Sequence, residues 1–78
     1  MDNKTITRSR QKFVELAEKR VSRAIKDIRL IGNLSNRSNY SYTQEDVRKI
    51  VKALKDEVDA LKARFEATGS DSKPVFKL

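Results

Sequence analysis

The chain has 78 residues without a cysteine or a histidine, and 18 basic residues against 11 acidic ones give it a net charge of +7. One small domain is the most that this length allows, and the composition excludes disulfide bonds and the usual zinc sites, so regular helix packing and self-association must stabilise the fold. Residues 1–40 hold ten basic and four acidic groups, and this local excess attracts phosphate-bearing partners. The alternative is that the charge only keeps a small oligomer soluble.

The ends of the chain and its hydropathy indicate a location. No apolar run approaches the roughly 20 residues that a membrane span needs, and residues 1–4 are not followed by a signal-peptide core. We therefore expect a cytoplasmic protein with no membrane partner. Residues 1–7 are expected to form a flexible N-terminus, residues 8–68 a helical hairpin domain, and residues 69–78 a flexible C-terminal tail.

The first predicted helix runs over residues 8–31. Its apolar residues recur at spacings of three and four, which is the pattern of a heptad seam. They are Val14, Ala17, Val21, Ala24, Ile28 and Ile31. Four further apolar residues, Phe13, Leu16, Ile25 and Leu30, widen the stripe beyond what one partner helix covers, so we expect contact with a second chain. Glu15 and Lys19 are four residues apart and predict a stabilising ion pair.

A polar loop over residues 32–42 separates this helix from a second one. Gly32 follows the last periodic residue, where a C-cap glycine is expected, and Thr43 is the predicted N-cap of the second helix, with acidic residues in the first turn. The second seam consists of Val47, Val51, Leu54, Val58, Leu61 and Phe65, and Gly69 is expected to end the helix. The sequence therefore predicts an all-α fold, an antiparallel two-helix hairpin that assembles into a helical homo-oligomer.

Catalytic constellations are missing from the sequence. General acid-base chemistry would fall to carboxylates, lysine or tyrosine, and nearly all the carboxylates lie beside basic residues on helix surfaces. Asp56, Glu57 and Asp59 form a short acidic cluster, which is typical of a solvated helix face rather than of a metal site. There is no glycine-rich phosphate loop and no hydrolase motif. We predict a protein that is not an enzyme and that has no cofactor and no metal.

The polar loop and the end of the first helix contain the side chains of a nucleotide-binding site. Arginine binds phosphate through two hydrogen bonds, asparagine pairs with the edge of adenine, and tyrosine stacks on bases. The candidates are Arg23, Lys26 and Arg29 for phosphates, and Asn33, Asn36, Arg37, Asn39 and Tyr40 for base and ribose. In the alternative interpretation the asparagines satisfy turn and cap hydrogen bonds, and Tyr40 and Tyr42 pack on the end of the hairpin.

A family resemblance rests on the segment RLIGNLSNRSNYSYTQEDVRKIVKAL, preceded by KRVSRAIKDI and followed by LKARF. This stretch resembles small helical-hairpin proteins of phages and mobile elements, in particular the hairpin shared by the anti-CBASS and anti-Thoeris sponge proteins. The resemblance implies an obligate oligomer, often a hexamer, that sequesters cyclic nucleotide immune signals without cleaving them. The chain lacks the additional elements of the anti-Thoeris members, so the resemblance favours a cyclic oligonucleotide ligand over one derived from ADP-ribose.

Two functions of other classes stay open. A basic nucleic-acid-binding module of a phage or plasmid would lay the first helix along a phosphate backbone, and its affinity would fall steeply with salt and depend little on the loop. A protein-binding inhibitor would instead use the broad apolar stripe, and it would need neither a cyclic nucleotide nor a nucleic acid.

Overall fold

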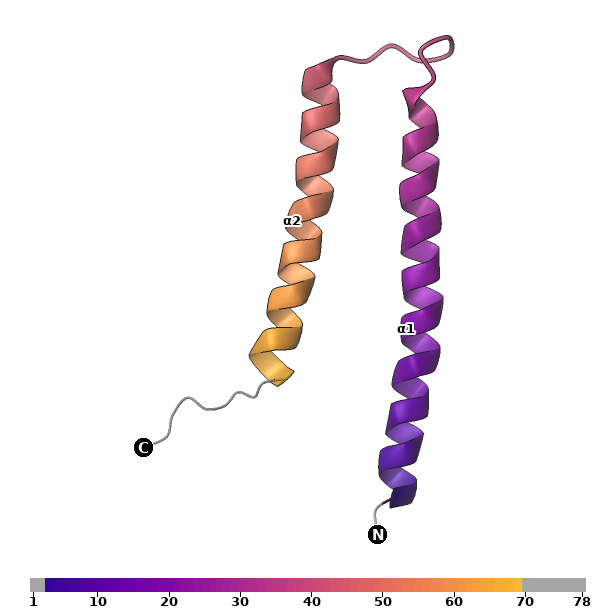
Figure 1. The fold of residues 1–78 in the computed structure, drawn as a ribbon, viewed down its shortest axis with the longest axis vertical. Coiled ribbons are helices and arrows are strands. Elements are labelled where there is room, and N and C mark those ends of the chain that lie inside the picture. Colours follow the sequence, from indigo (N-terminus) through magenta and orange to yellow (C-terminus); the bar gives the residue numbers. More distant parts are fainter. Residues whose placement is uncertain (1–2, 70–78) are drawn as a thin grey trace, which may run out of the picture. The chain divides into compact units, whose positions relative to one another are not determined.

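The computed structural model describes residues 3–69, which form two long helices and a short one (Figure 1). Helix α1 spans Asn3–Gly32, the 3-10 helix η1 spans Asn33–Ser35, and helix α2 spans Gln44–Gly69. No strand occurs in this part of the chain, so the prediction of an all-α fold is confirmed. The chain divides into two compact units, Met1–Ser41 and Tyr42–Leu78. The antiparallel pairing of the helices and the assembly of an oligomer stay predictions.

Helix α1 begins at Asn3 rather than at Arg8, so the backbone of residues 3–7 is helical. Neither glycine nor proline interrupts residues 3–31, and nothing in the sequence marks an earlier stop. Two parts of the expected flexible ends, residues 1–2 and 70–78, lie outside the described residues.

Gly32 does not have the role that was predicted for it. A glycine that terminates a helix adopts the left-handed conformation with positive φ, whereas Gly32 has φ −60° and ψ −28°, which is right-handed helical backbone. It is the last residue of α1, and the chain continues directly into the tighter turn of η1. A Cβ atom at this position would meet nothing within 4 Å. The conformational freedom of glycine is therefore not used here.

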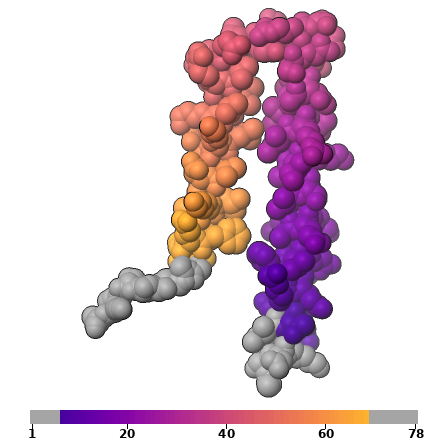
Figure 2. All heavy atoms as spheres, in the orientation of Figure 1, coloured from indigo at the N-terminus to yellow at the C-terminus, as the bar shows by residue number. Residues whose placement is uncertain are grey.

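Both long helices expose their apolar seams, because a single helix cannot bury its own side chains. On α1, Val21 is 56% exposed, and on α2, Val58 is 57% exposed. No side chain among the described residues is buried, and the space-filling view shows the side chains of each helix open to solvent (Figure 2). In proteins most of the stability of an amphipathic helix comes from packing of its apolar face rather than from helix propensity. Each unit therefore needs a covering surface for its seam.

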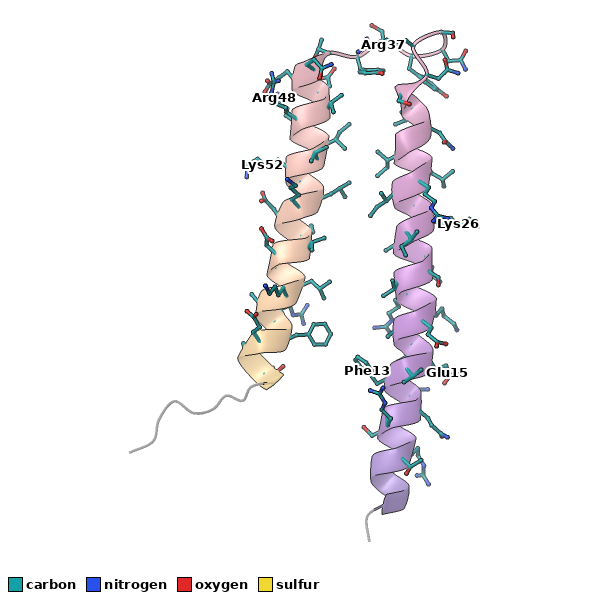
Figure 3. All side chains as sticks on the ribbon, viewed as in Figure 1. Phe13, Glu15, Lys26, Arg37, Arg48 and Lys52 are labelled. Carbon is teal, nitrogen blue, oxygen red and sulfur yellow. The ribbon has the colours of Figure 1, made fainter. Side chains whose placement is uncertain are left out.

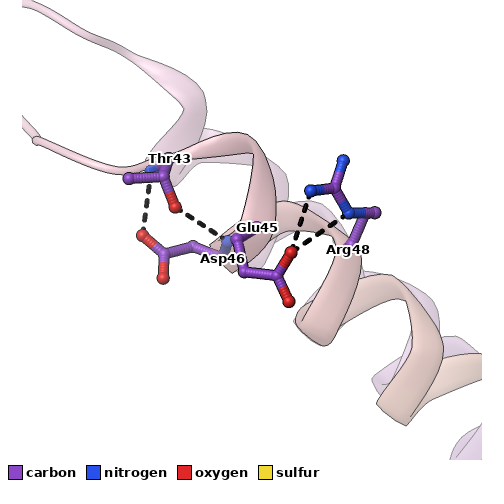
Figure 4. Close-up of polar contacts among 4 residues, drawn as sticks. All are labelled: Thr43, Glu45, Asp46 and Arg48. Atoms are coloured by element: carbon purple, nitrogen blue, oxygen red, sulfur yellow. Dashed lines mark hydrogen bonds and ion pairs between the residues drawn. The ribbon is translucent and has the colours of Figure 1, made fainter.

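Helix α2 begins with a reciprocal cap, which confirms the predicted role of Thr43 (Figure 4). Thr43 Oγ1 accepts a hydrogen bond from the backbone N–H of Asp46 at 3.0 Å, and Asp46 Oδ2 accepts one from the backbone N–H of Thr43 at 2.8 Å. The two bonds satisfy backbone donors that the first helical turn leaves without partners. The carboxylates of Glu45 and Asp46 also favour the positive end of the helix dipole. The helix extends to Gly69, which is the last residue that the structure describes.

Candidate functional site

All eight candidate residues belong to one unit, Met1–Ser41. Three of them, Arg23, Lys26 and Arg29, lie on α1. Asn33 begins η1. The remaining four, Asn36, Arg37, Asn39 and Tyr40, lie in the loop that follows η1. The candidate site is therefore continuous along the chain.

The three basic residues of α1 follow one another at intervals of three. Three residues are about 60° short of a full helical turn, so successive side chains are offset by about 60° and the three cover about a third of the circumference. All three are exposed. Figure 3 shows Lys26 on the other side of α1 from Phe13, which borders the apolar seam. The charges therefore stay accessible when the seam is covered.

Asn36 organises the loop. Its backbone oxygen accepts hydrogen bonds from the backbone N–H groups of Asn39, at 3.1 Å, and Tyr40, at 3.0 Å. Its side-chain Oδ1 accepts a third from the N–H of Ser38, at 2.9 Å. Asparagine is suited to this turn because its side chain can accept a bond from the backbone two residues ahead. The structural role that the sequence offered as an alternative is thus confirmed for Asn36.

The other loop candidates present their side chains to solvent. Tyr40 is 49% exposed, while its backbone is held by the bond to Asn36. Asn33 and Asn39 are exposed, and their side-chain amides form no hydrogen bond with another described residue. Arg37 is exposed in the middle of the turn. The turn therefore fixes the backbone and leaves an aromatic ring and two amides at its surface.

Tyr42 differs from Tyr40 in burial. It is half-buried, whereas Tyr40 is exposed. A ring that is already partly covered has less free face on which a base could stack. Tyr40 is therefore the better stacking candidate of the two tyrosines.

The charges of α1 are not neutralised locally. The helix has nine basic and three acidic residues, and no ion pair joins two of its described side chains. The predicted pair of Glu15 and Lys19 does not form. Both side chains are exposed, and hydration competes well with an attraction that is worth only a few tenths of a kcal/mol at a helix surface. The positive field of α1 is therefore available to a ligand.

Metal ligands do not cluster in the described part of the chain. No group of three or more His, Cys, Asp or Glu residues there is arranged to hold a metal ion. Within the acidic cluster, Asp56 Oδ2 accepts a hydrogen bond from Lys52 Nζ at 2.9 Å. No helix within residues 3–69 has the length and apolarity to cross a membrane.

The sequence offered a turn role for the asparagines without distinguishing Asn36, for which the Asn-x-Ser spacing of Asn36 and Ser38 was the available signal. It also did not single out Arg8, Lys12 and Lys19 as basic residues on the same side of α1 as Arg23, which their successive spacings of four, seven and four indicate. Comparison with protein-family models, with curated proteins and with solved structures finds no match to this chain.

Proposed function

We propose that this protein is a non-catalytic binding protein of a phage or mobile element, which sequesters cyclic oligonucleotide immune signals in the bacterial cytoplasm. The observation that carries the proposal is that all eight candidate side chains between Arg23 and Tyr40 are exposed. Basic groups without acidic partners lead along α1 into a turn that presents amides and an aromatic ring. This combination suits a ligand that has phosphates and bases together.

Each part of the site has a different task in this proposal. Arg23, Lys26 and Arg29 bind the phosphates, with Arg able to contact two oxygens of one phosphate. Tyr40 stacks on a base, an interaction worth about 1–3 kcal/mol. Asn39 and Asn33 bind base edges or ribose hydroxyls. Asn36 holds the turn through its carbonyl oxygens and has its amide N–H groups left for a ligand.

Self-association completes the site. One helix and one turn form a convex surface, which contacts only one side of a small ligand, whereas tight sites are concave. We propose that α1 and α2 pair antiparallel and that chains join into dimers, with a hexamer as the assembly that the family resemblance implies. Symmetric packing then brings basic side chains of several chains around one anion. The exposed seams supply the apolar area for this assembly.

The proposal is tested by thermal shifts with cyclic di- and trinucleotides, ADP-ribose derivatives, and short RNA and DNA. Ligand binding raises the melting temperature in proportion to the logarithm of ligand excess, so a tight sponge gives a shift of several degrees with one or two cyclic compounds. Recovery of the ligand intact after denaturation shows that it is not cleaved. Absence of any shift with the cyclic compounds contradicts the proposal, and capture of a protein partner would then favour an inhibitor.

Substitutions in the loop locate the ligand. Tyr40→Ala removes the stacking ring but retains the backbone N–H that closes the turn, so it should abolish the shift while the oligomer persists. Tyr40→Phe should keep most of the shift. Asn36→Ala is a poorer test, because it also removes the acceptor for Ser38. Asn36→Asp keeps that acceptor and replaces the amide N–H groups by negative charge, so it should weaken binding without disturbing the turn.

A further inference from the structure

Five basic residues of α1 lie along one side of the helix and form a basic stripe, defined as Arg8, Lys12, Lys19, Arg23 and Lys26. They are separated by four, seven, four and three positions, so they fall within about 60° of the helix circumference. All five are exposed. Glu15 borders one edge of the stripe and Asp27 the other, and neither forms an ion pair with a described residue. Only two of the five residues belong to the candidate ligand site.

The basic stripe lies roughly opposite the apolar seam of α1. Lys26 and the seam-bordering Phe13 project from different sides of the helix (Figure 3). Whatever covers the seam, the stripe therefore remains in solvent. An assembly that buries the six seam residues of α1 would still present this row of charges on its surface, although Leu30 lies on the same side of the helix as the stripe.

The length of the basic stripe fits a polymer better than a compact ligand. Its ends are eighteen residues apart, which corresponds to about 27 Å along the helix axis. A cyclic dinucleotide contacts one or two turns of a helix. A nucleic acid duplex has one phosphate charge per about 1.7 Å of its axis, so it offers phosphates over the whole length. Three of the five groups, at Arg8, Lys12 and Lys19, have no other role in the proposed function.

A lipid surface fits the same charges less well. A helix that lies on a membrane inserts its apolar face, and basic side chains that assist it flank that face and reach the headgroups. The stripe lies on the opposite side, so it would point into water when the seam is inserted. The arrangement therefore favours a polyanion that binds from solvent.

We propose that the basic stripe binds the phosphate backbone of duplex nucleic acid, independently of the loop and without sequence preference. Lysine and arginine contact phosphates through charge, and no asparagine or glutamine of α1 falls on the same side of the helix to read base edges. The contact thus does not need the loop residues, although it shares Arg23 and Lys26 with the candidate ligand site. Duplex binding and cyclic nucleotide binding consequently compete in part.

The test uses a variant in which Arg8, Lys12 and Lys19 are all changed to Gln, with the full chain and a fluorescent duplex. Its matched control changes Arg48, Lys52 and Lys62 to Gln, which removes the same charge from residues that already have acidic partners. Glutamine is a good helix former, and circular dichroism verifies the helix content of both. Anisotropy is measured at several salt concentrations.

Five phosphate contacts per chain predict a slope of log affinity against log salt of about −4.5, so affinity falls about 500-fold between about 50 and 200 mM salt. The stripe variant should reduce the slope to about −2 and weaken binding at least tenfold, while the control keeps the wild-type slope. Equal weakening in both variants, or a salt-independent wild type, overturns the proposal.

Two further measurements distinguish duplex binding from membrane binding and from cyclic nucleotide binding. Vesicles containing phosphatidylserine should bind the wild type and the stripe variant equally weakly, and stripe-dependent vesicle binding without duplex binding overturns the proposal. The thermal shift with a cyclic nucleotide should survive in the stripe variant, since its three substituted residues lie outside the loop site. Loss of duplex binding with retention of that shift supports two separate surfaces.

Discussion

Helices α1 and α2 have the same apolar pattern but differ in the charge of their polar faces. Each has a heptad seam of six apolar residues, but α1 has nine basic and three acidic residues, whereas α2 has six of each. Ion pairs on α2 join Arg48 to Glu45 at 2.8 Å, Lys52 to Asp56 at 2.9 Å and Lys62 to Glu66 at 4.0 Å. No pair joins the described residues of α1. The two helices therefore differ in net charge and in ion pairing. Basic residues of α2 pair with acidic residues of the same helix, and those among the described residues of α1 do not.

The two helix ends that flank the loop also differ, in how their backbone groups are capped. α2 starts with two hydrogen bonds between Thr43 and Asp46. α1 ends without a left-handed cap and passes through Gly32 into η1. The order of the loop comes instead from the turn around Asn36. Hydrogen bonds of a loop turn thus order the first unit at the joint, and those of a helix cap order the second.

The largest expected effect comes from placing a charge in either apolar seam, which tests whether both seams are buried in the assembly. Val21→Asp on α1 and Val58→Asp on α2 each place a charge in a surface that the proposed assembly buries, at a cost of about 3 kcal/mol or more. Both should lose cooperative melting and the oligomer, as measured by circular dichroism and light scattering. Ser22→Asp, next to the seam position but outside the seam, should melt like the wild type. An oligomer that persists in both seam variants contradicts a shared buried face.

The cap of α2 should give the next largest effect. Thr43→Ala removes the acceptor for the Asp46 N–H and should lower the free energy of unfolding by about 1 kcal/mol, or the melting temperature by about 4–8 °C. Thr43→Ser retains the hydroxyl and should stay within a few tenths of a kcal/mol of the wild type. If alanine and serine melt alike, the hydrogen bonds of the cap contribute no stability.

Gly32→Ala should stabilise the protein. The residue has helical φ and ψ, and a Cβ atom has open space there, so alanine loses less entropy on folding without a clash. The expected gain in the free energy of unfolding is about 0.5–1 kcal/mol, measured by denaturant titration. Destabilisation instead would mean that the chain needs glycine for another conformation at this joint.

Substitutions that remove surface charge test the difference between the two helices directly. Changing Arg48, Lys52 and Lys62 to Gln should cost about 1 kcal/mol in low salt, as three surface pairs are worth a few tenths each, and the cost should vanish in concentrated salt. Changing Arg8, Lys12 and Lys19 to Gln should leave the stability of the free protein unchanged or raise it slightly, because like charges repel one another there. Equal destabilisation would remove the distinction between the helices.

Much of the local structure was predictable because it depends on neighbouring residues. The 3.6-residue periodicity defined both helices, and the Thr43 hydroxyl with acidic residues behind it defined the start of α2. The start of α1 was placed five residues too late because residues 3–7 contain no glycine, proline or capping box that marks where the helix begins. Gly32 was misinterpreted because a glycine at the end of a helical pattern usually caps it, and only the backbone angles distinguish the two cases.

The candidate site was predictable as a set of residue types and less so as an arrangement. The sequence places Arg23 to Tyr40 in one stretch, and the structure places them in one unit. The sequence could not show that Asn36 holds the turn while the side-chain amides of Asn33 and Asn39 stay available to a ligand, since the three asparagines have the same spacing. Which side chains are satisfied by the backbone depends on the turn conformation, which three-residue repeats do not specify.

The central claim is that the unpaired charges of α1 beside the loop bind a phosphate-bearing ligand, and matched charge variants test it most directly. One variant changes Arg23, Lys26 and Arg29 to Gln, and its control changes Arg48, Lys52 and Lys62 to Gln, so both lose three positive charges. Titration calorimetry with the cyclic nucleotide that shifts the wild type should show at least a hundredfold weaker binding to the first variant, as expected when three phosphate contacts worth about 1 kcal/mol or more each are lost, and unchanged binding to the second. Equal affinity of the two variants would contradict the claim.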